Sequence, residues 1–193
     1  SDKSGVAGKT YYYKVRVINA VNRTEGYSDD SKPVSGRQLI CPEWKSIAAN
    51  GSSGVSLSWK KVSGATGYII YRSTAKNGSY KKLKTLKGTG VVKYTDKTGK
   101  KNQVYYYRIQ ASGKAGKSAY SAKSWCRILN TPVLADVLPQ ESGVMKLTWN
   151  KVEHAGGYIL YRKKGTETDY KKVKTISGAS VTSWQDVTEQ GMD

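Results

Sequence analysis

The sequence predicts an all-β fold made of tandem antiparallel β-sandwiches. Apolar residues alternate with polar ones over short segments such as 57–59, 68–70, 107–111 and 13–17, a period of two that is typical of half-buried strands. Glycine-rich turn sequences separate these segments at short intervals. The chain contains 15 Tyr and 5 Trp but no Phe, a composition that favours tyrosine-rich strands over leucine-rich helices. About seven short strands in roughly 90 to 100 residues are the pattern of an antiparallel sandwich.

The strand pattern repeats along the chain. Trp149 follows Trp59 by 90 residues, and the same offset relates further pairs: Tyr68 and Tyr158, Tyr71 and Tyr161, Arg72 and Arg162, Asp96 and Asp186, and Pro42 and Pro132. A second match relates Tyr105–Ala111 to Tyr11–Val17. The repeat predicts domain boundaries at 1–40, 41–130 and 131–193, with one complete unit between two partial ones.

The recurring aromatic residues stand in three of the expected strands: Trp59 and Trp149 in the second, Tyr68 and Tyr158 in the third, and Tyr107 and Tyr13 in the sixth. This arrangement resembles the fibronectin type III domain, in the tandem form of secreted or surface proteins of Gram-positive bacteria. The resemblance implies a seven-stranded sandwich with these six side chains in its core. The sequence lacks an Arg-Gly-Asp tripeptide, so the resemblance does not extend to integrin binding.

The resemblance also orders the elements along the chain. Residues 1–40 correspond to a corner loop and the last two strands, residues 41–130 to all seven strands, and residues 131–193 to the first five. We therefore expect the first and last segments to hold complementary parts of one sandwich.

The chain is strongly basic, because 33 Lys and Arg against 14 Asp and Glu give a formal net charge of +19. Lysines recur in two corresponding clusters: Lys81, Lys82 and Lys84, and Lys171, Lys172 and Lys174. Since lysine recurs in every unit and does not gather with stacking aromatics on one face, we expect a solvated surface, protected sheet edges and no nucleic-acid partner. Weak adhesion to anionic glycans or cell-wall polymers is the alternative, with Trp125 as an exposed aromatic contact.

Residues suited to catalysis are sparse. His154 is the only histidine and lies in a glycine-rich turn, where we expect it to be exposed. Asp96 and Asp186 precede the sixth strand, where a carboxylate commonly caps a turn. Asp29 and Asp30 supply too few oxygens for a calcium ion. We therefore predict no catalytic residue, no metal site, no cofactor and no enzymatic activity.

The two cysteines, Cys41 and Cys126, fall at opposite ends of the middle unit in the topology that the resemblance implies. A strand length of ~25 to 30 Å separates them, far beyond the ~7 Å limit for a disulfide. We predict two free thiols. No apolar run approaches the ~20 residues needed to span a bilayer, so we expect no membrane insertion.

Three functions remain open at this point. The first is a non-catalytic extracellular spacer or interaction module, secreted or attached to the cell surface, whose partners are the other domains of its parent protein. The second is self-assembly, in which residues 1–40 of one chain complete residues 131–193 of the next and build a head-to-tail fibre. The third is weak binding of anionic wall polymers or glycans.

The self-assembly hypothesis depends on two complementary apolar surfaces. Three residues of the first segment would cover five residues of the last: Tyr13, Val15 and Val17 against Leu147, Trp149, Tyr158, Leu160 and Ile176. Burying about five large apolar side chains at ~1.5 to 3 kcal/mol each returns about 10 kcal/mol, which rivals an association cost of ~4 to 15 kcal/mol. We expect the middle unit to keep one chain from pairing its own ends. The competing explanation is that the missing strands belong to a longer parent chain.

Overall fold

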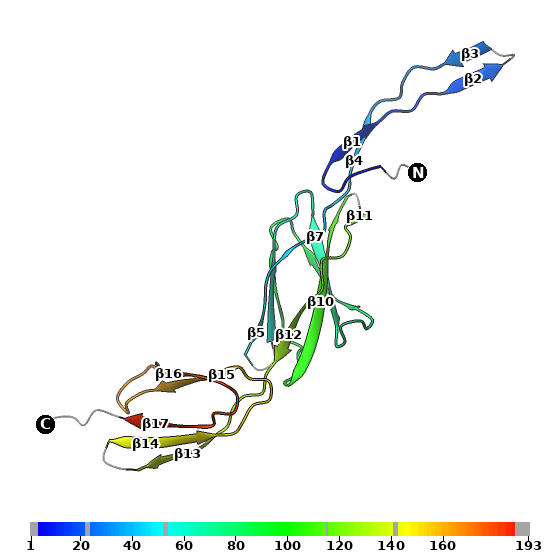
Figure 1. Cartoon of the computed structure of the whole chain (residues 1–193). Coiled ribbons are helices and arrows are strands. Elements are labelled where there is room, and N and C mark those ends of the chain that lie inside the picture. The colour runs from blue at the N-terminus through cyan, green and yellow to red at the C-terminus, as the bar shows by residue number, and fades with distance from the viewer. Residues whose placement is uncertain (1–3, 22–23, 52–53, 115, 141–142, 188–193) are drawn as a thin grey trace. The chain divides into compact units, whose positions relative to one another are not determined.

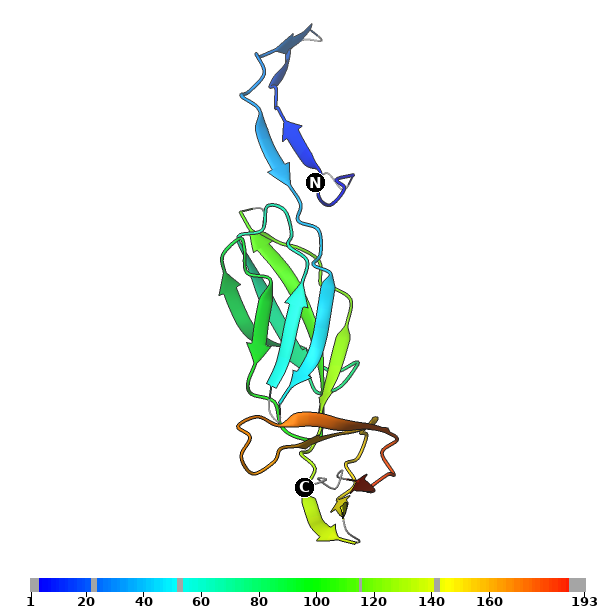
Figure 2. The same ribbon diagram turned by 90° about the vertical axis from the view of Figure 1, so that its left-hand side faces the viewer.

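The computed structural model describes residues 4–21, 24–51, 54–114, 116–140 and 143–187. Within these ranges all regular structure is β, strands β1 to β17 (Figures 1 and 2), and no helix is long and apolar enough to cross a membrane. The chain divides into two compact units, the first made mostly of residues up to Cys126 and the second mostly of residues from Arg127 onward. The predicted all-β class is confirmed.

The first four strands form an irregular hairpin, here called the N-terminal ribbon (residues 10–37). β1 (Thr10–Tyr13) pairs with β4 (Val34–Arg37), and β2 (Ile18–Val21) pairs with β3 (Thr24–Tyr27), both antiparallel (Figure 1). The sequence predicts two long strands in this segment. The structure divides each of them in two, because serine hydroxyls take the place of ladder partners in the stretch between the two pairs.

The middle sandwich contains two antiparallel sheets. One sheet has the order β5 (Trp44–Asn50), β6 (Gly54–Trp59) and β9 (Lys93–Asp96). The other has the order β11 (Gly116–Lys117), β10 (Gln103–Gly113), β7 (Gly67–Ser73) and β8 (Lys81–Lys87), and β12 (Ser124–Ile128) also pairs with β10. Since β11 and β12 are two pieces of one last strand, this is the seven-stranded arrangement that the sequence predicts.

The core of the middle sandwich comes from alternate positions of β6, β7 and β10, as the period of two predicts. Fully buried side chains of these strands include Val55, Leu57, Trp59, Tyr68, Ile70, Tyr107 and Ile109, and Val62 and Ile128 outside them are fully buried as well. Tyr107, Ile109 and Ala111 of β10 stand opposite Arg72, Ile70 and Tyr68 of β7 in the ladder. This ladder fixes which residues of the sixth strand face the third.

In residues 127–140 and 143–187, the described part of the C-terminal unit, five strands form two sheets. β13 (Leu134–Pro139), β14 (Val144–Trp149) and β17 (Ser183–Val187) form one sheet, and β15 (Gly157–Arg162) and β16 (Lys171–Ser177) form the other. The register of β15 with β16 repeats that of β7 with β8, including the irregularity after Leu160 and after Ile70. These strands are the counterparts of β5 to β9.

Gly67 begins β7 because the backbone of the neighbouring strand lies against it. A Cβ atom at this position would meet the carbonyl oxygen of Leu86, and a Cβ at Gly157 would meet that of Ile176 in the same way. Gly67→Ala is therefore expected to cost about 1 to 3 kcal/mol of unfolding free energy, measured by urea denaturation. The matched control is Gly90→Ala, since nothing lies within 4 Å of that Cβ position. Equal stability of the two variants would contradict this packing role.

Candidate functional site

The middle sandwich holds a buried charged group at the end of β9. The Asp96 carboxylate is fully buried and accepts hydrogen bonds from the guanidinium of Arg72 at 2.7 Å and from the hydroxyl of Tyr107 at 2.9 Å. Arg72 also lies over the ring of Tyr105, 4.6 Å from its centroid. The carboxylate thus links the three-stranded sheet to β7 and β10 of the other sheet, which is a structural role.

Burial raises the pKa of Tyr107, and the neighbouring Asp96 carboxylate raises it further. The hydroxyl stays protonated in the folded state while a tyrosine in the unfolded chain ionises near pH ~10. The stability contributed by this tyrosine is therefore complete below pH ~10 and is lost as the pH rises above it. We expect the unfolding free energy to fall from pH 9 to 11, and to fall less steeply in Tyr107→Phe. Urea denaturation at each pH measures both slopes, and parallel slopes would contradict the assignment.

The C-terminal unit repeats this group with one partner fewer. The Asp186 carboxylate accepts a hydrogen bond from Arg162 at 2.7 Å, the same length as its counterpart. The position of Tyr107 has no counterpart within residues 127–140 and 143–187, which end with β17, the equivalent of β9. Within the described residues, Arg162 and Asp186 thus repeat the pairing of Arg72 with Asp96.

Two pairs of serines, which the sequence analysis did not single out, join the last two strands of a sandwich. In the middle sandwich the N–H groups of Ile109 and Ala111 donate to the hydroxyls of Ser121 and Ser118, at 3.1 and 3.0 Å. Each serine N–H donates back to the carbonyl of the same residue, at 2.9 Å in both cases. These serine bonds could have been predicted from the Ser-x-x-Ser spacing, which occurs at Ser28 and Ser31 and again at Ser118 and Ser121.

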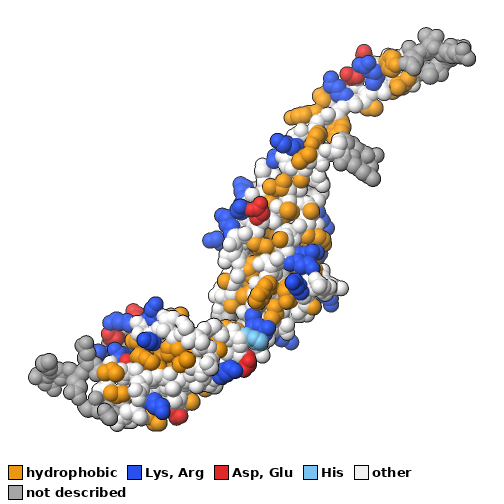
Figure 3. Space-filling view, in the orientation of Figure 1, with side chains coloured by type: hydrophobic (Ala, Val, Ile, Leu, Met, Phe, Trp, Pro, Cys, Tyr) orange, Lys and Arg blue, Asp and Glu red, His pale blue; other side chains and the backbone are white. Residues whose placement is uncertain are grey.

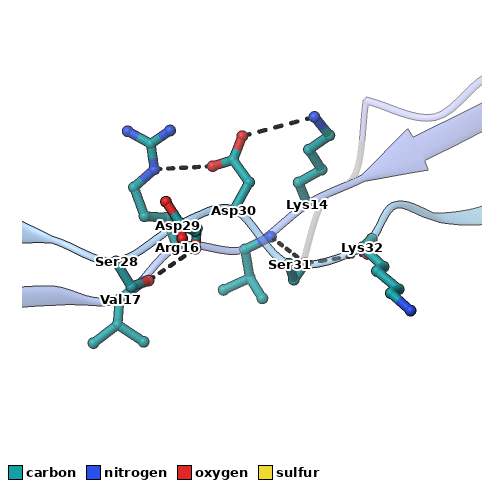
Figure 4. Close-up of polar contacts among 9 residues, drawn as sticks. Lys14, Arg16, Val17, Ser28, Asp29, Asp30, Ser31 and Lys32 are labelled. Carbon is teal, nitrogen blue, oxygen red and sulfur yellow. Dashed lines mark hydrogen bonds and ion pairs between the residues drawn. The ribbon is translucent and has the colours of Figure 1, made fainter.

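The N-terminal ribbon makes the same bonds with its own serines. Val15 and Val17 donate to the hydroxyls of Ser31 and Ser28 at 3.0 Å, and the two serine N–H groups donate back at 2.9 and 3.1 Å. The ribbon therefore has the geometry of a sixth and seventh strand. Figure 4 shows these serine contacts.

The two faces of the ribbon differ in chemistry. On one face Asp30 pairs with Arg16 at 2.9 Å and with Lys14 at 3.7 Å, while Val17 points to the other side (Figure 4). Tyr13 is 50% exposed, Val15 69% and Val17 67%, whereas their counterparts Tyr107, Ile109 and Ala111 are fully buried. Tyr13, which the resemblance places in a core, is half exposed in the ribbon.

The C-terminal unit has an apolar groove beside a small core. Its small core contains Trp149, Val152 and Tyr158, with Leu147, Leu160, Ile176 and Trp184 packed partly buried around it. A groove of about 370 Å³ opens beside this core and is lined by apolar residues that include Leu129, Leu134, Tyr158 and Leu160. Figure 3 shows hydrophobic side chains gathered on the surface of this unit. Ile159 is 52% exposed, while its counterpart Ile69 is buried.

The predicted lysine contacts lie on two edge strands. Lys81, Lys82 and Lys84 are exposed on β8, at one end of the strand order β11-β10-β7-β8, and Lys171, Lys172 and Lys174 are exposed on β16. Trp125 is 60% exposed on β12, which pairs with β10. Because β7 and β10 lie between β8 and β12, Trp125 is at the opposite side of the sheet from the β8 lysines.

The outer face of β10 carries an aromatic cluster that the sequence analysis missed. Arg108 lies over the rings of Tyr80 and Tyr120, with centroids at 5.1 and 5.4 Å, and Tyr71 packs edge-on against Tyr120 at 5.1 Å. Tyr71 also donates to the side chain of Gln110 at 2.9 Å. Buried and half-buried positions alternate along β10, so Arg108 and Gln110 face outward. This alternation in the sequence could have predicted a polar and aromatic outer face.

The histidine and the two cysteines, the remaining residues suited to catalysis or metal binding, do not lie together in one site. His154 is exposed in its turn, with a positive φ of 63°. Cys41 is exposed and Cys126 half-buried, and both are free thiols. In the part of the chain that the structure describes, no three His, Cys, Asp or Glu side chains gather closely enough to hold a metal ion.

No family model matches the sequence. The chain is similar to part of an amylopullulanase of Thermoanaerobacterium saccharolyticum, 35% identical over 86 residues, which is 44% of this chain and 7% of that enzyme. It is also similar to an amylopullulanase of Thermoanaerobacter thermohydrosulfuricus, 30% identical over 118 residues, 59% of this chain and 8% of that enzyme. The chain thus spans less than a tenth of the length of these relatives.

Among solved structures, the chain is similar to an Fn3-like protein from Clostridium thermocellum, with 24% identity and a TM-score of 0.42 over 46% of this chain and 92% of that one. It is also similar to domains FN1–FN3 of chicken CNTN1, with 16% identity and a TM-score of 0.47 over 92% of this chain and 65% of that one. The fold class of the described residues is all-β, with the strands arranged in antiparallel sheets.

Proposed function

We propose that this chain is a non-catalytic spacer and interaction module of an extracellular bacterial protein that acts on polysaccharide. The observation that carries the proposal is the filled interior of the middle sandwich, in which the buried carboxylate of Asp96 is held by Arg72 and Tyr107. A carboxylate held by an arginine and a tyrosine inside a packed core has no room for a substrate. Its partners are then the other domains of the parent protein.

The relatives support the polysaccharide part of this proposal. The matches to amylopullulanases cover 86 to 118 residues, only 7 to 8% of those enzymes. A segment of that size corresponds to one sandwich domain and not to a whole catalytic architecture. We therefore assign the chain to an accessory part of such a protein, located outside the cell.

The proposal is tested by incubating the purified chain with pullulan and soluble starch. We expect no release of reducing ends above a buffer control. Hydrolysis that co-purifies with the chain through successive purification steps would overturn the proposal.

Weak binding to anionic wall polymers is the second candidate, favoured by the exposed lysines along β8 and β16. Because the β8 lysines lie at the opposite side of their sheet from Trp125, we expect attraction by net charge and no shaped site. Retention on immobilised polyglutamate should fall with salt. It should also fall equally when Lys81, Lys82 and Lys84, or the loop lysines Lys97, Lys100 and Lys101, are changed to Glu. A loss confined to the β8 variant would instead indicate a specific site.

A further inference from the structure

We infer that the middle sandwich is the part of this chain that binds anionic polysaccharide, through the exposed lysines spread over its surface. The inference rests on the second candidate function, binding to anionic wall polymers, and names the unit that carries out the binding. Three features of this sandwich support it: its charge, the pairing of its acidic residues, and the different charge of the corresponding strands in the C-terminal unit.

The positive charge of the chain is concentrated in residues 41–130, which include the middle sandwich. These residues contain 18 of the 33 Lys and Arg but only 2 of the 14 Asp and Glu. All 15 of their lysines are exposed. Of the formal net charge of +19, +16 therefore belongs to this part of the chain.

Both acidic residues of the middle sandwich are already paired. Glu43 pairs with Lys60 at 2.6 Å, and the buried carboxylate of Asp96 pairs with Arg72 at 2.7 Å. Among the described strands of the larger sheet, β7, β8, β10, β11 and β12, no Asp or Glu occurs. The sandwich therefore has no further carboxylate of its own to neutralise its other basic residues.

The corresponding strands of the C-terminal unit do not share this charge. Residues 131–193 follow residues 41–103 by the 90-residue repeat, and they contain 8 Lys and Arg against 8 Asp and Glu, where residues 41–103 contain 13 against 2. β13 to β17 nevertheless form the counterparts of β5 to β9. The fold therefore does not require the excess of lysine in the middle sandwich. Because like charges repel one another, this excess costs stability, and we attribute it to binding.

The turns that precede β8 and β16 show the difference at single residues. Asn77 and Ser79 precede the β8 lysines, whereas Glu167 and Asp169 stand at the same positions before β16. Glu167 pairs with Lys171 at 2.6 Å. Asn77 instead accepts a hydrogen bond from a further basic side chain, that of Lys123, at 2.9 Å. An anionic polymer thus meets lysines alone at β8 and lysines beside carboxylates at β16.

The spread of the lysines fits a polymer better than a small anion. They lie on β8, in the loop 97–101 before β10 and in the segment 114–123 after it. Attraction between exposed charges extends only ~8 Å at physiological ionic strength, so one small anion reaches few of these lysines. A flexible polyanion that reaches several at once binds more tightly, because each further contact forms at a high effective concentration.

The aromatic residues of this sandwich favour a polysaccharide over a single-stranded nucleic acid. Proteins that bind single strands combine basic residues with aromatic rings on which the bases stack. Here the guanidinium of Arg108 already lies over the rings of Tyr80 and Tyr120. Trp125 is exposed on β12, at the opposite side of the sheet from the β8 lysines. Base stacking beside these lysines is therefore disfavoured.

The location is tested with two variants that lower the net charge by the same amount. Asn77→Glu with Ser79→Asp introduces residues of the C-terminal repeat into the middle sandwich, and Lys163→Ser with Lys164→Thr introduces residues of the middle repeat into the C-terminal unit. All four positions are exposed, so both variants should fold, which circular dichroism checks. Fluorescence anisotropy with labelled polygalacturonate at low salt measures binding. Because fewer counterions are released when a polyanion meets fewer net positive charges, we expect the first variant to bind roughly ten-fold more weakly. The second should bind as the unmodified chain does.

The outcomes separate this inference from the function on which it rests. Equal weakening of the two variants would overturn the inference and leave an attraction exerted by the whole chain. If the unmodified chain does not bind polygalacturonate, the second candidate function is itself wrong and the inference fails with it. Binding of the uncharged methyl ester of the polymer with equal affinity would overturn both, since charge would then not be the cause.

Two further ligands test the kind of partner. Trigalacturonate should bind far more weakly than the polymer at equal carboxylate concentration, and equal affinity would indicate one small site and contradict a polymeric ligand. Single-stranded DNA should bind no more tightly than dextran sulfate of similar length, since charge density then sets the affinity. Tighter binding of the DNA would overturn the assignment to polysaccharide.

Discussion

Replacing Trp59 by alanine is expected to lower the unfolding free energy of the middle sandwich by about 3 to 5 kcal/mol. The indole is fully buried at the end of β6, with ring centroids 6.2 Å from Trp44 and 5.3 Å from Tyr68. Its removal leaves a cavity between two other aromatic rings that cannot collapse without moving both sheets. Urea denaturation followed by near-UV circular dichroism measures the loss.

The matched control is Trp149→Ala in the C-terminal unit. Trp149 packs against Tyr158 at 5.4 Å, but it also lines the open groove. Less surrounding structure is lost there, so we expect a smaller reduction in unfolding free energy, below that of Trp59→Ala. Equal losses would contradict this difference in surrounding structure.

Asp96→Asn is expected to cost about 3 kcal/mol, the usual price of removing one partner from a buried ion pair. The change leaves the guanidinium of Arg72 without its carboxylate and gives the Tyr107 hydroxyl a neutral acceptor in place of a charged one. The Arg72 side chain is 24% exposed, so water compensates only in part. Thermal and urea unfolding of the variant measure the change.

Asp186→Asn provides the comparison within the same chain. The Arg162 side chain is 41% exposed, and water can take over much of the pairing, so we expect a loss of about 1 kcal/mol or less. If the two variants lost the same stability, burial of the carboxylate would not be what makes Asp96 important.

The sequence predicts the core of the middle sandwich well, because its signal is local. Trp59, Tyr68 and Tyr107 follow a period of two and recur at a fixed offset, and all three are buried. The same reasoning places Tyr13 in a core, and the structure leaves it half exposed. Periodicity tells which side of a strand is apolar. It does not tell whether another strand lies against that side.

Contacts between distant residues were not predictable in this way. The pairing of Arg72 with Asp96 joins residues 24 positions apart, and the stack of Arg108 on Tyr80 and Tyr120 joins three separate segments. Such contacts depend on how the sheets pack and have no signature in one segment. The serine bonds differ, since Ser28 and Ser31 recur as Ser118 and Ser121 and could have been found from the repeat.

The lysines on β8 and β16 have a consequence for the way this chain can aggregate. If the β8 or β16 edge of a second copy paired with either edge, its exposed lysines would lie within ~4.8 Å of the lysines of the first copy. Amyloid-like growth by edge pairing is thereby disfavoured at low ionic strength. Salt screens charges beyond ~8 Å at physiological ionic strength, so raising the salt concentration weakens the charge repulsion at the lysine edges. Higher ionic strength is therefore expected to favour aggregation through these edges.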